Sequence, residues 1–322
     1  MLTFGKIMNL FAMARRLFAL LALLLFLPAL QGGAQETHCF ATRDTCSLYL
    51  DIWRPAPGAP TSIGEVQKPT ILFVFGGGFI MGRRNDPFHT PWFNTLTADG
   101  YTVVAIDYRL GMKGVQVGKG LSGMFRASDA FYQAQQMGVE DVFSAVRFLS
   151  DHPELGIDPG NIVLSGSSAG AIISLASAYD IACGRTGELP EGFAFKGVMS
   201  FAGAIISNSG APKFPKAPCP LLLLHGTADQ AVAYNHFGAM GRGIWGSNYL
   251  AGQLQKKGWD CCIYRFKDRT HDVAAYMAYL WNLEKEFLEK SVMQGVHRSI
   301  DAQVDDPSLP SWGAISLNDI YK

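Results

Sequence analysis

Residues Asn161 to Ile172 read Asn-Ile-Val-Leu-Ser-Gly-Ser-Ser-Ala-Gly-Ala-Ile. The apolar run 162–164 predicts a buried strand, and the small and aliphatic residues that close the stretch are spaced as in a helix. Between the two lies Gly-x-Ser-x-Gly, with Gly166 and Gly170 on either side of Ser168. In this context the motif lifts a serine onto a sharp strand-to-helix turn, and the residues two before and two after it must be small. Ser168 is therefore a candidate nucleophile.

The same residues could also form an ordinary turn, because a bare Gly-x-Ser-x-Gly occurs often by chance. The helix that follows favours a functional site, because the first amide groups of this helix would point at Ser168 and stabilise negative charge there. The choice between the two interpretations depends on what the rest of the chain supplies.

Length and charge exclude several classes of function. A chain of 322 residues can hold one large α/β domain or two small ones. Lysine plus arginine and aspartate plus glutamate number 27 each, so no net charge attracts nucleic acid or an anionic membrane. No cysteine and histidine spacing resembles a zinc site. We therefore expect neither a nucleic-acid partner nor a metal.

The N-terminus has the order of a secretory signal peptide. Basic residues precede the apolar stretch Leu17 to Leu30, and small residues follow up to Ala34. We expect residues 1–34 to be a signal peptide, cleaved after Ala34, and the mature protein to be secreted or periplasmic without a stable membrane span. A membrane anchor is the alternative, although this stretch is short for a span.

All six cysteines lie beyond that cleavage site, where disulfides are permitted. Cys39 and Cys46 flank a short polar loop and are the best candidates for a pair. For the other four, buried free thiols are an equal alternative.

Strands and helices are expected to alternate along the mature chain. Apolar runs predict strands at 47–53, 70–75, 101–106, 162–164, 198–202, 220–225 and 261–266. Helical patterns are expected at 91–98, 141–149, 169–176, up to about 255, and at 273–288. This alternation predicts an α/β fold with a mainly parallel central sheet and helices on both faces, in one domain over residues 35–292.

Two segments show no clear pattern. Residues 112–137 are rich in glycine and without periodicity, which predicts a long loop. Such a loop could fold over the site or be a surface insertion. Residues 293–322 are polar and contain Asp305-Asp306-Pro307, so we expect them to form an extended C-terminal tail.

A serine nucleophile needs a base, normally a histidine that a carboxylate holds in one tautomer. Asp229 comes directly after the apolar run 220–225, and His271 lies between the last strand and the last helix. The carboxyl ends of parallel strands meet at one edge of a sheet, so Ser168, Asp229 and His271 should lie together.

The order Ser168, Asp229, His271 gives the chain a specific resemblance. Over about residues 47–288 it resembles an α/β-hydrolase, and within that superfamily the esterases and lipases of the carboxylesterase and hormone-sensitive-lipase-like groups. The segments Leu224 to Asp229 and Asp107 to Leu110 match family segments. The resemblance implies that Ser168 is the nucleophile, Asp229 the acid and His271 the general base, with no cofactor.

The resemblance also implies an oxyanion hole formed by the backbone amides of Gly77, Gly78 and Ala169. Each such donor is worth roughly 3 kcal/mol in the transition state. Those esterases carry His-Gly-Gly-Gly at this strand end, whereas here Phe75 stands at the histidine position. The difference concerns the geometry of the loop more than the chemistry.

Several other residues have simpler expected roles. We expect His225 to be structural, Ser167 to shape the turn, and Arg109 to pair with Asp141. Asp268 and Asp272 could compete with Asp229 for the base, but Asp272 better fits a helix cap. Five aromatic residues could line a pocket or pack in the core: Phe79, Trp92, Phe125, Tyr234 and Phe237.

The sequence thus favours a secreted serine carboxylesterase that acts through an acyl-enzyme. Because the segment Gly203 to Cys219 is short, the cap should be small and the site open to short acyl or aromatic esters, including acetyl or feruloyl groups on polysaccharides. One alternative is a peptidase of the prolyl-oligopeptidase type, although Ala171 stands where those peptidases usually carry glycine. The other is a hydrolase-fold binding protein without catalysis.

Overall fold

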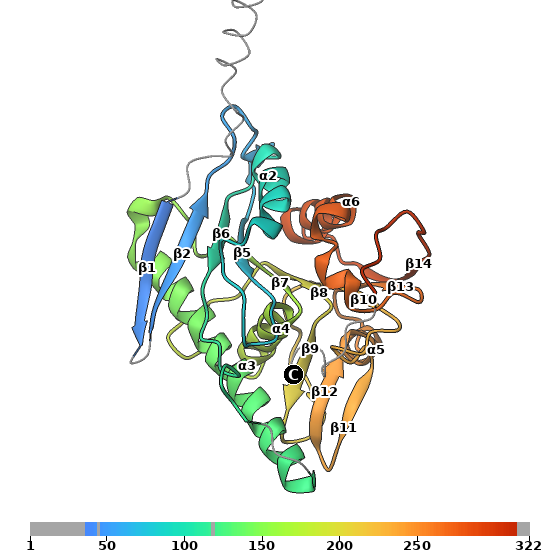
Figure 1. Cartoon of the computed structure of the whole chain (residues 1–322). Coiled ribbons are helices and arrows are strands. Elements are labelled where there is room, and N and C mark those ends of the chain that lie inside the picture. Colours follow the sequence, from blue (N-terminus) through green and yellow to red (C-terminus); the bar gives the residue numbers. More distant parts are fainter. Residues whose placement is uncertain (1–35, 44–45, 117–119, 314–322) are drawn as a thin grey trace, which may run out of the picture.

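A computed structural model describes residues 36–43, 46–116 and 120–313. The predicted signal peptide, residues 1–34, lies outside the described residues. Within them, nine strands form the central sheet (Figure 1). In spatial order these are β1 (Glu36–Arg43), β2 (Cys46–Trp53), β6 (Val103–Ile106), β5 (Thr70–Val74), β7 (Ile162–Ser167), β8 (Gly197–Phe201), β10 (Leu221–Gly226), β13 (Cys261–Phe266) and β14 (Ser299–Val304).

The sheet is mainly parallel. β1 pairs with β2, and β2 with β6, in antiparallel register, and the remaining neighbours from β6 to β14 are parallel. Every residue of β5, β6, β7, β8 and β10 is buried, as expected of strands covered on both faces. The predicted fold class is confirmed.

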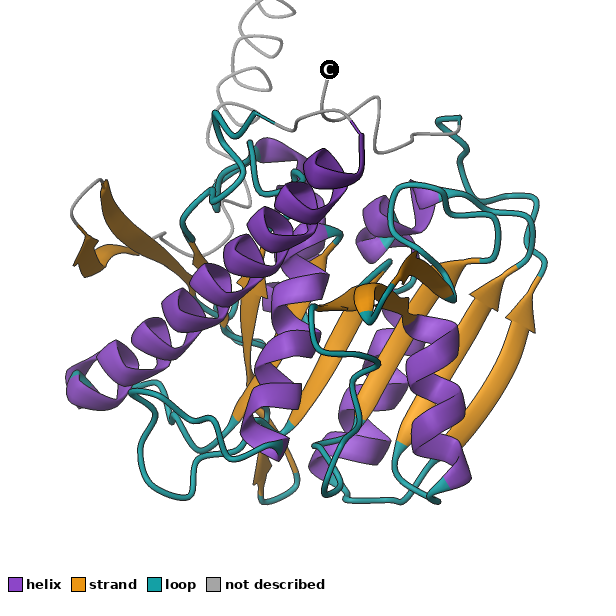
Figure 2. Cartoon of the chain, turned by 90° about the horizontal axis from the view of Figure 1, so that it is seen from below, coloured by secondary structure: helices purple, strands orange, loops and turns teal. Residues whose placement is uncertain are grey.

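Helices cover both faces of this sheet (Figure 2). α3 (Gly120–Asp151) packs against α4 (Ala169–Ala182), and α5 (Ser247–Lys256) packs on β10 and β13. α2 (Thr90–Ala98) lies with α6 (Trp281–Glu286), where the indole Nε1 of Trp92 donates to Glu284 Oε2 at 2.7 Å. Trp92 is therefore a core residue and does not line a pocket.

The expected loop over residues 112–137 is wrong from Gly120 onward. Residues 120–137 form the first part of α3, a helix of 32 residues. The glycines of the segment misled the prediction, because Gly120 and Gly123 lie at the start of the helix and not in a loop. A Cβ on Gly138 would lie 2.4 Å from the Ile173 Cδ1 of α4, so glycine there lets the two helices approach.

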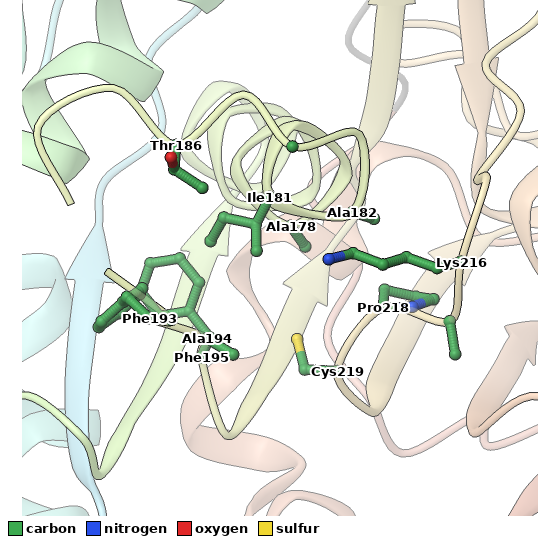
Figure 3. Close-up of a pocket in the computed structure, with 13 residues that line it drawn as sticks. Ala178, Ile181, Ala182, Thr186, Phe193, Ala194, Phe195, Lys216, Pro218 and Cys219 are labelled. Atoms are coloured by element: carbon green, nitrogen blue, oxygen red, sulfur yellow. The ribbon is translucent and has the colours of Figure 1, made fainter. Parts of the chain in front are cut away.

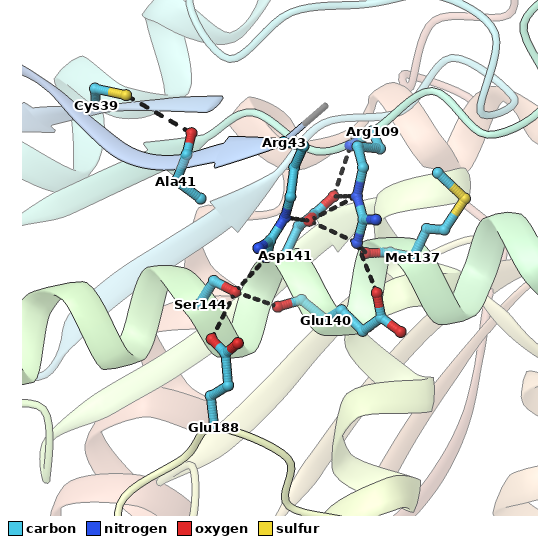
Figure 4. A network of polar contacts seen from close by, with 9 residues as sticks. All are labelled: Cys39, Ala41, Arg43, Arg109, Met137, Glu140, Asp141, Ser144 and Glu188. Atoms are coloured by element: carbon cyan, nitrogen blue, oxygen red, sulfur yellow. Dashed lines mark hydrogen bonds and ion pairs between the residues drawn. The ribbon is translucent and has the colours of Figure 1, made fainter. Parts of the chain in front are cut away.

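A buried ion cluster fixes the C-terminal half of α3 to the sheet (Figure 4). The backbone amide of Arg109 donates to Asp141 Oδ2 at 2.8 Å, and its Nε donates to Oδ1 at 2.9 Å. Arg43 of β1 reaches the same helix and donates to Ser144 Oγ at 2.7 Å. Burial raises the pKa of Asp141, although the hydrogen bonds from Arg109 oppose this shift. The predicted pair of Arg109 and Asp141 is confirmed.

A second sheet lies beside the carboxyl ends of the central strands. It consists of β11 (His236–Ala239), β12 (Arg242–Gly246) and β9 (Ala204–Ser207), in that order. The expectation of a plain loop at 203–219 is wrong at β9, and the expectation of helical structure after Asp229 is wrong at β11 and β12. These strands were missed because β9 and β12 form through antiparallel pairing between segments far apart in the sequence. A small hairpin of β3 (Ser62–Ile63) and β4 (Val66–Gln67) completes the strands.

The C-terminal segment differs from its prediction. The expected helix 273–288 is broken into η3 (His271–Ala275), η4 (Met277–Tyr279), α6 and the π-helical η5 (Phe287–Met293). The tail is wrong as an extended appendage, because β14 pairs in parallel with β13 and Arg265 Nε donates to Asp301 Oδ1 at 2.6 Å. β14 alternates exposed and half-buried residues as an edge strand does, which in sequence resembles a polar tail.

Two further findings concern the cysteines and the membrane. In the β1–β2 hairpin Cys39 lies opposite Tyr49 and Cys46 opposite Arg43, so the register does not bring the two thiols face to face. No disulfide joins them in the structure. Of the helices in the described residues, none combines the length and the apolar character that a membrane crossing requires.

Candidate active site

Ser168 lies between β7 and α4 in a strained backbone conformation. Its φ is 52° and its ψ −117°, a region that residues other than glycine rarely adopt. A Cβ on Gly166 would lie 2.3 Å from the carbonyl oxygen of Gly170, and one on Gly170 would lie 2.0 Å from that of Val74. Both glycines are therefore required by close backbone approach, as the motif predicts, and the turn holds Ser168 at the sheet edge.

The structure brings Ser168, Asp229 and His271 together. His271 Nε2 lies 2.8 Å from Ser168 Oγ, and His271 Nδ1 lies 2.8 Å from Asp229 Oδ2. Only 8–9% of the surface of each residue is exposed. The imidazole is therefore positioned to accept the serine proton on Nε2, while the carboxylate of Asp229 accepts a hydrogen bond from Nδ1.

Backbone contacts between two neighbouring loops set the distance between Asp229 and His271. Thr227 N donates to the carbonyl of Phe266 at 2.9 Å, and Ala228 N donates to that of Arg269 at 2.9 Å. A Cβ on Gly226 would lie 2.2 Å from the carbonyl oxygen of Thr270, so this approach also depends on glycine. The loops after β10 and β13 are thus joined directly before each catalytic candidate.

The carboxylate of Asp229 is fully satisfied. Its Oδ1 accepts from the amides of Ala231 at 2.9 Å and Val232 at 3.0 Å, and its Oδ2 faces both His271 and His225. Burial alone would raise the pKa of Asp229, but the hydrogen bonds from His225 and His271 lower it well below its usual range. Asp229 therefore stays ionised and holds the orientation of His271.

His225 was expected to be structural, and it does belong to β10, but it also contacts Asp229. Its Nε2 lies 3.2 Å from Asp229 Oδ2 and 3.2 Å from the carbonyl of Val232, while its Nδ1 lies 2.8 Å from Ser247 Oγ. Two acceptors face Nε2, so this nitrogen must carry a proton. The four-residue spacing of His225 and Asp229 was the only signal in the sequence.

Replacing His225 is expected to impair the site through Asp229. His225→Leu should lower kcat about tenfold with little change in KM, because a charged acceptor loses one hydrogen bond of about 1.5–3 kcal/mol. His225→Gln, whose amide can reach the position of Nε2, should recover part of the loss. Steady-state kinetics checks both variants. Equal kcat in His225→Leu and the parent would contradict this role.

The predicted oxyanion residues are placed unequally. Gly78 and Ala169 line the pocket at Ser168. Gly77 lies one residue before Gly78, in a turn in which the carbonyl of Gly77 accepts from Ile80 N and Met81 N at 3.1 Å each. Ala169 opens α4, where the first amide groups of a helix have no partner within it. The geometry thus brings Gly78 and Ala169 directly to the site, with Gly77 shaping the loop.

Phe75 stands where the resembled esterases carry a histidine, and its ring packs against neighbouring residues. Its ring centroid lies 4.5 Å from that of Tyr108, and a Cβ on Gly82 would lie 2.6 Å from its ring. The ring of Phe75 is buried and therefore supports the glycine loop through apolar contact.

The competing residues of the sequence take other roles. Ser167 Oγ donates to the carbonyl of Ala274 at 2.7 Å. Asp268 N donates to Thr227 Oγ1 at 2.9 Å. The carboxylate of Asp272 accepts from Ser311 Oγ and Trp312 N at 3.2 Å each, so it binds the C-terminal segment and the predicted helix cap is wrong. None of these contacts is to the imidazole of His271.

A cavity of about 380 Å³ lies far from this constellation, at the C-terminal end of α4 (Figure 3). Ile181, Phe193, Lys216 and Cys219 are among its lining residues. Because α4 has 14 residues, it separates this cavity from Ser168 by about 20 Å. In the part of the chain that the structure describes, no group of three or more His, Cys, Asp or Glu side chains could hold a metal ion.

Two family models match parts of the chain. Residues 30–182 match the model of the carboxylesterase family, and residues 124–243 match the phospholipase/carboxylesterase model. Esterase 2 of Thermogutta terrifontis superposes with a TM-score of 0.53 at 23% identity, covering 82% of this chain and 97% of that one.

Curated relatives match over part of their length. Fumonisin B1 esterase of Sphingopyxis macrogoltabida is 30% identical over 144 residues, 42% of this chain and 23% of that protein. Human dipeptidyl peptidase 8 is 25% identical over 229 residues, 62% of this chain and 23% of that protein. The chain thus spans about a quarter of the length of these relatives. With its sheet, its serine turn and these matches, the chain has the α/β-hydrolase fold, and residues 30–182 are similar to the carboxylesterase family.

Proposed function

We propose that the protein is a serine carboxylesterase that hydrolyses carboxylic esters through an acyl-enzyme intermediate. The observation that carries this proposal is that one ring nitrogen of His271 lies 2.8 Å from Ser168 Oγ and the other lies 2.8 Å from Asp229 Oδ2. The matches to carboxylesterase models support the same reaction class.

In the first half of the reaction Ser168 Oγ attacks the ester carbonyl carbon while His271 Nε2 takes the serine proton. Asp229 stabilises the imidazolium through Nδ1, and the amides of Ala169 and of the Gly77–Gly78 loop stabilise the oxyanion. The intermediate collapses as His271 returns the proton to the departing alcohol. A water molecule, deprotonated by His271, then attacks the acyl-enzyme and releases the acid.

We also propose that residues 1–34 export the protein, so that it acts as a secreted or periplasmic enzyme. Its substrate would be a small ester or an ester on a polysaccharide, such as an acetyl or feruloyl group. The order of basic, apolar and small residues before Gln35 supports the first point. The pocket that opens at Ser168 beside Phe131 of α3, Ile206 of β9 and Ile244 of β12 supports the second.

The test is hydrolysis by protein that starts at Gln35, on p-nitrophenyl acetate and butyrate and on methyl ferulate. We expect turnover that falls on acidification, because only a neutral imidazole can take the serine proton. A rate that does not fall on acidification of the folded protein would contradict the role of His271. Folded protein without activity on any ester would favour the binding-protein alternative.

The match to dipeptidyl peptidase 8 favours a second candidate, a serine peptidase with the same triad. The assay therefore includes glycyl-proline p-nitroanilide. Cleavage of this amide at a kcat/KM above that of the esters would identify a peptidase. We expect the esters to be preferred.

A further inference from the structure

A small apolar pocket opens at Ser168 and adjoins a larger groove. The pocket is lined by Ala169 and Phe79 on one side and by Phe131, Ile206 and Ile244 on the other. The last three residues also line a neighbouring groove of about 330 Å³. This volume lies at the lower end of the roughly 300–1,000 Å³ that small-molecule sites occupy. Pocket and groove therefore share part of their walls, and the groove lies beside the pocket of the candidate nucleophile.

The groove lies between the N-terminal part of α3 and the β11–β12 hairpin. Figure 1 shows both elements reaching past the ends of the central strands. α3 contributes Met124, Phe125 and Phe131, and the hairpin contributes Phe237 and Met240. Three of these side chains are largely exposed, Met124 at 62%, Phe237 at 67% and Met240 at 78%. Large exposed apolar side chains that gather beside a catalytic candidate indicate a surface that a ligand covers.

Hydrogen bonds hold the inner walls of the groove in place. The side-chain amide of Gln135 on α3 both donates to the carbonyl of Ile206 at 3.0 Å and accepts from its amide at 2.8 Å. Ile206 pairs in turn with Ile244 of β12. The helix, β9 and the hairpin are thus joined at residues that pocket and groove share, so these walls are held in place.

The charges at the groove are already neutralised. Of the described residues that line it, Arg242 alone is charged, and its guanidinium pairs with Asp129 of α3. The same guanidinium lies 5.4 Å from the centre of the Phe125 ring. Asp129 also accepts from Asn208 Nδ2 at 2.8 Å. With these partners engaged, the groove offers apolar surface and methionine side chains that adapt to different shapes.

We propose that this groove binds an extended, uncharged hydrocarbon group of the ester, aliphatic or aromatic, while the ester carbonyl lies against Ser168. The inference rests on the proposed esterase function and specifies its substrate class. Esters with such a group are preferred over simple acetates, because burial of apolar surface contributes about 25 cal/mol per Å². The group can belong to the acyl or to the alcohol part of the ester.

The test fills the groove without touching the triad. Ala127→Trp places an indole in the groove, since Ala127 is one of its lining residues, and Arg126→Trp puts the same side chain on the exposed face of the same helix. We expect Ala127→Trp to lower kcat/KM at least 20-fold on an extended ester and less than threefold on p-nitrophenyl acetate. Arg126→Trp should leave both values unchanged.

Two substrate series identify the part of the ester that the groove holds. In one, p-nitrophenyl acetate, butyrate and octanoate vary the acyl group; in the other, methyl, octyl and 1-naphthyl acetate vary the alcohol. The series whose longer members lose activity in Ala127→Trp names that part. If kcat/KM depends on chain length in the same way in Ala127→Trp and in the parent, for both series, the groove does not bind substrate and the proposal is overturned.

A binding measurement separates this inference from the proposed function. Calorimetry with 2-decanone, a ketone that cannot be hydrolysed, should show binding to the parent protein and at least tenfold weaker binding to Ala127→Trp. That result in a protein without esterase activity would support the groove and contradict the esterase. Equal binding to both proteins would overturn the groove, whatever the activity.

Discussion

Ser168→Ala is expected to abolish ester hydrolysis, with kcat at least about 10⁴-fold below that of the parent. The hydroxyl of Ser168 lies 2.8 Å from His271 Nε2, and alanine removes the attacking atom while it leaves the pocket and the oxyanion donors in place. Folding should be little affected, because alanine has the same Cβ at the strained position. Single-turnover and steady-state rates on p-nitrophenyl acetate measure the effect, and circular dichroism monitors the fold.

Ser167→Ala is the matched control for this variant. Ser167 is adjacent in sequence, but its hydroxyl donates to the carbonyl of Ala274 and does not reach His271. We expect its kcat to stay within a few-fold of the parent, with a loss of stability of about 1 kcal/mol from the missing hydrogen bond. If the two variants lose activity equally, Ser168 is not the nucleophile.

Asp229→Asn is expected to lower kcat about 10⁴-fold, with KM nearly unchanged. The amide group of asparagine can present a donor to His271 Nδ1, which would force the proton onto Nε2 and prevent that nitrogen from accepting the serine proton. The same change removes the negative charge that His225 and the amides of Ala231 and Val232 now stabilise. Kinetics over a pH series measures the loss.

Asp272→Asn provides the control, because Asp272 follows His271 directly in the sequence and is also buried. Its carboxylate binds Ser311 and Trp312, so the variant should loosen the C-terminal segment and leave kcat nearly unchanged. A large fall of kcat in Asp272→Asn, with a small one in Asp229→Asn, would show that the triad acid has been assigned to the wrong carboxylate.

The central strands and the serine turn were predictable because their residues have few alternatives. Continuous apolar runs suit strands that are covered on both faces, and Gly166 and Gly170 stand where any Cβ would clash with backbone. The first part of α3 was missed because Gly120 and Gly123 suggest a loop in the sequence, whereas both lie at the start of the helix. β14 was missed because an edge strand with alternating polar residues resembles a tail.

The candidate site was predictable to the extent that it depends on parallel topology. Ser168, Asp229 and His271 follow three strands that end at the same edge, so their meeting was expected from chain order. The contact of His225 with Asp229 was not expected, because chain order does not show that the loop after β10 turns back toward the strand. The groove was also missed, since it depends on the pairing of β9 with β12 and on the true length of α3.

The most direct test of the account is the mass of the enzyme during turnover. Protein that is acid-quenched while it hydrolyses p-nitrophenyl acetate should carry one acetyl group, on the peptide that contains Ser168, and the Ser168→Ala variant should carry none. An acetyl group on a different residue, or continued hydrolysis with no acylated enzyme under conditions where release of the acid limits the rate, would contradict the acyl-enzyme mechanism.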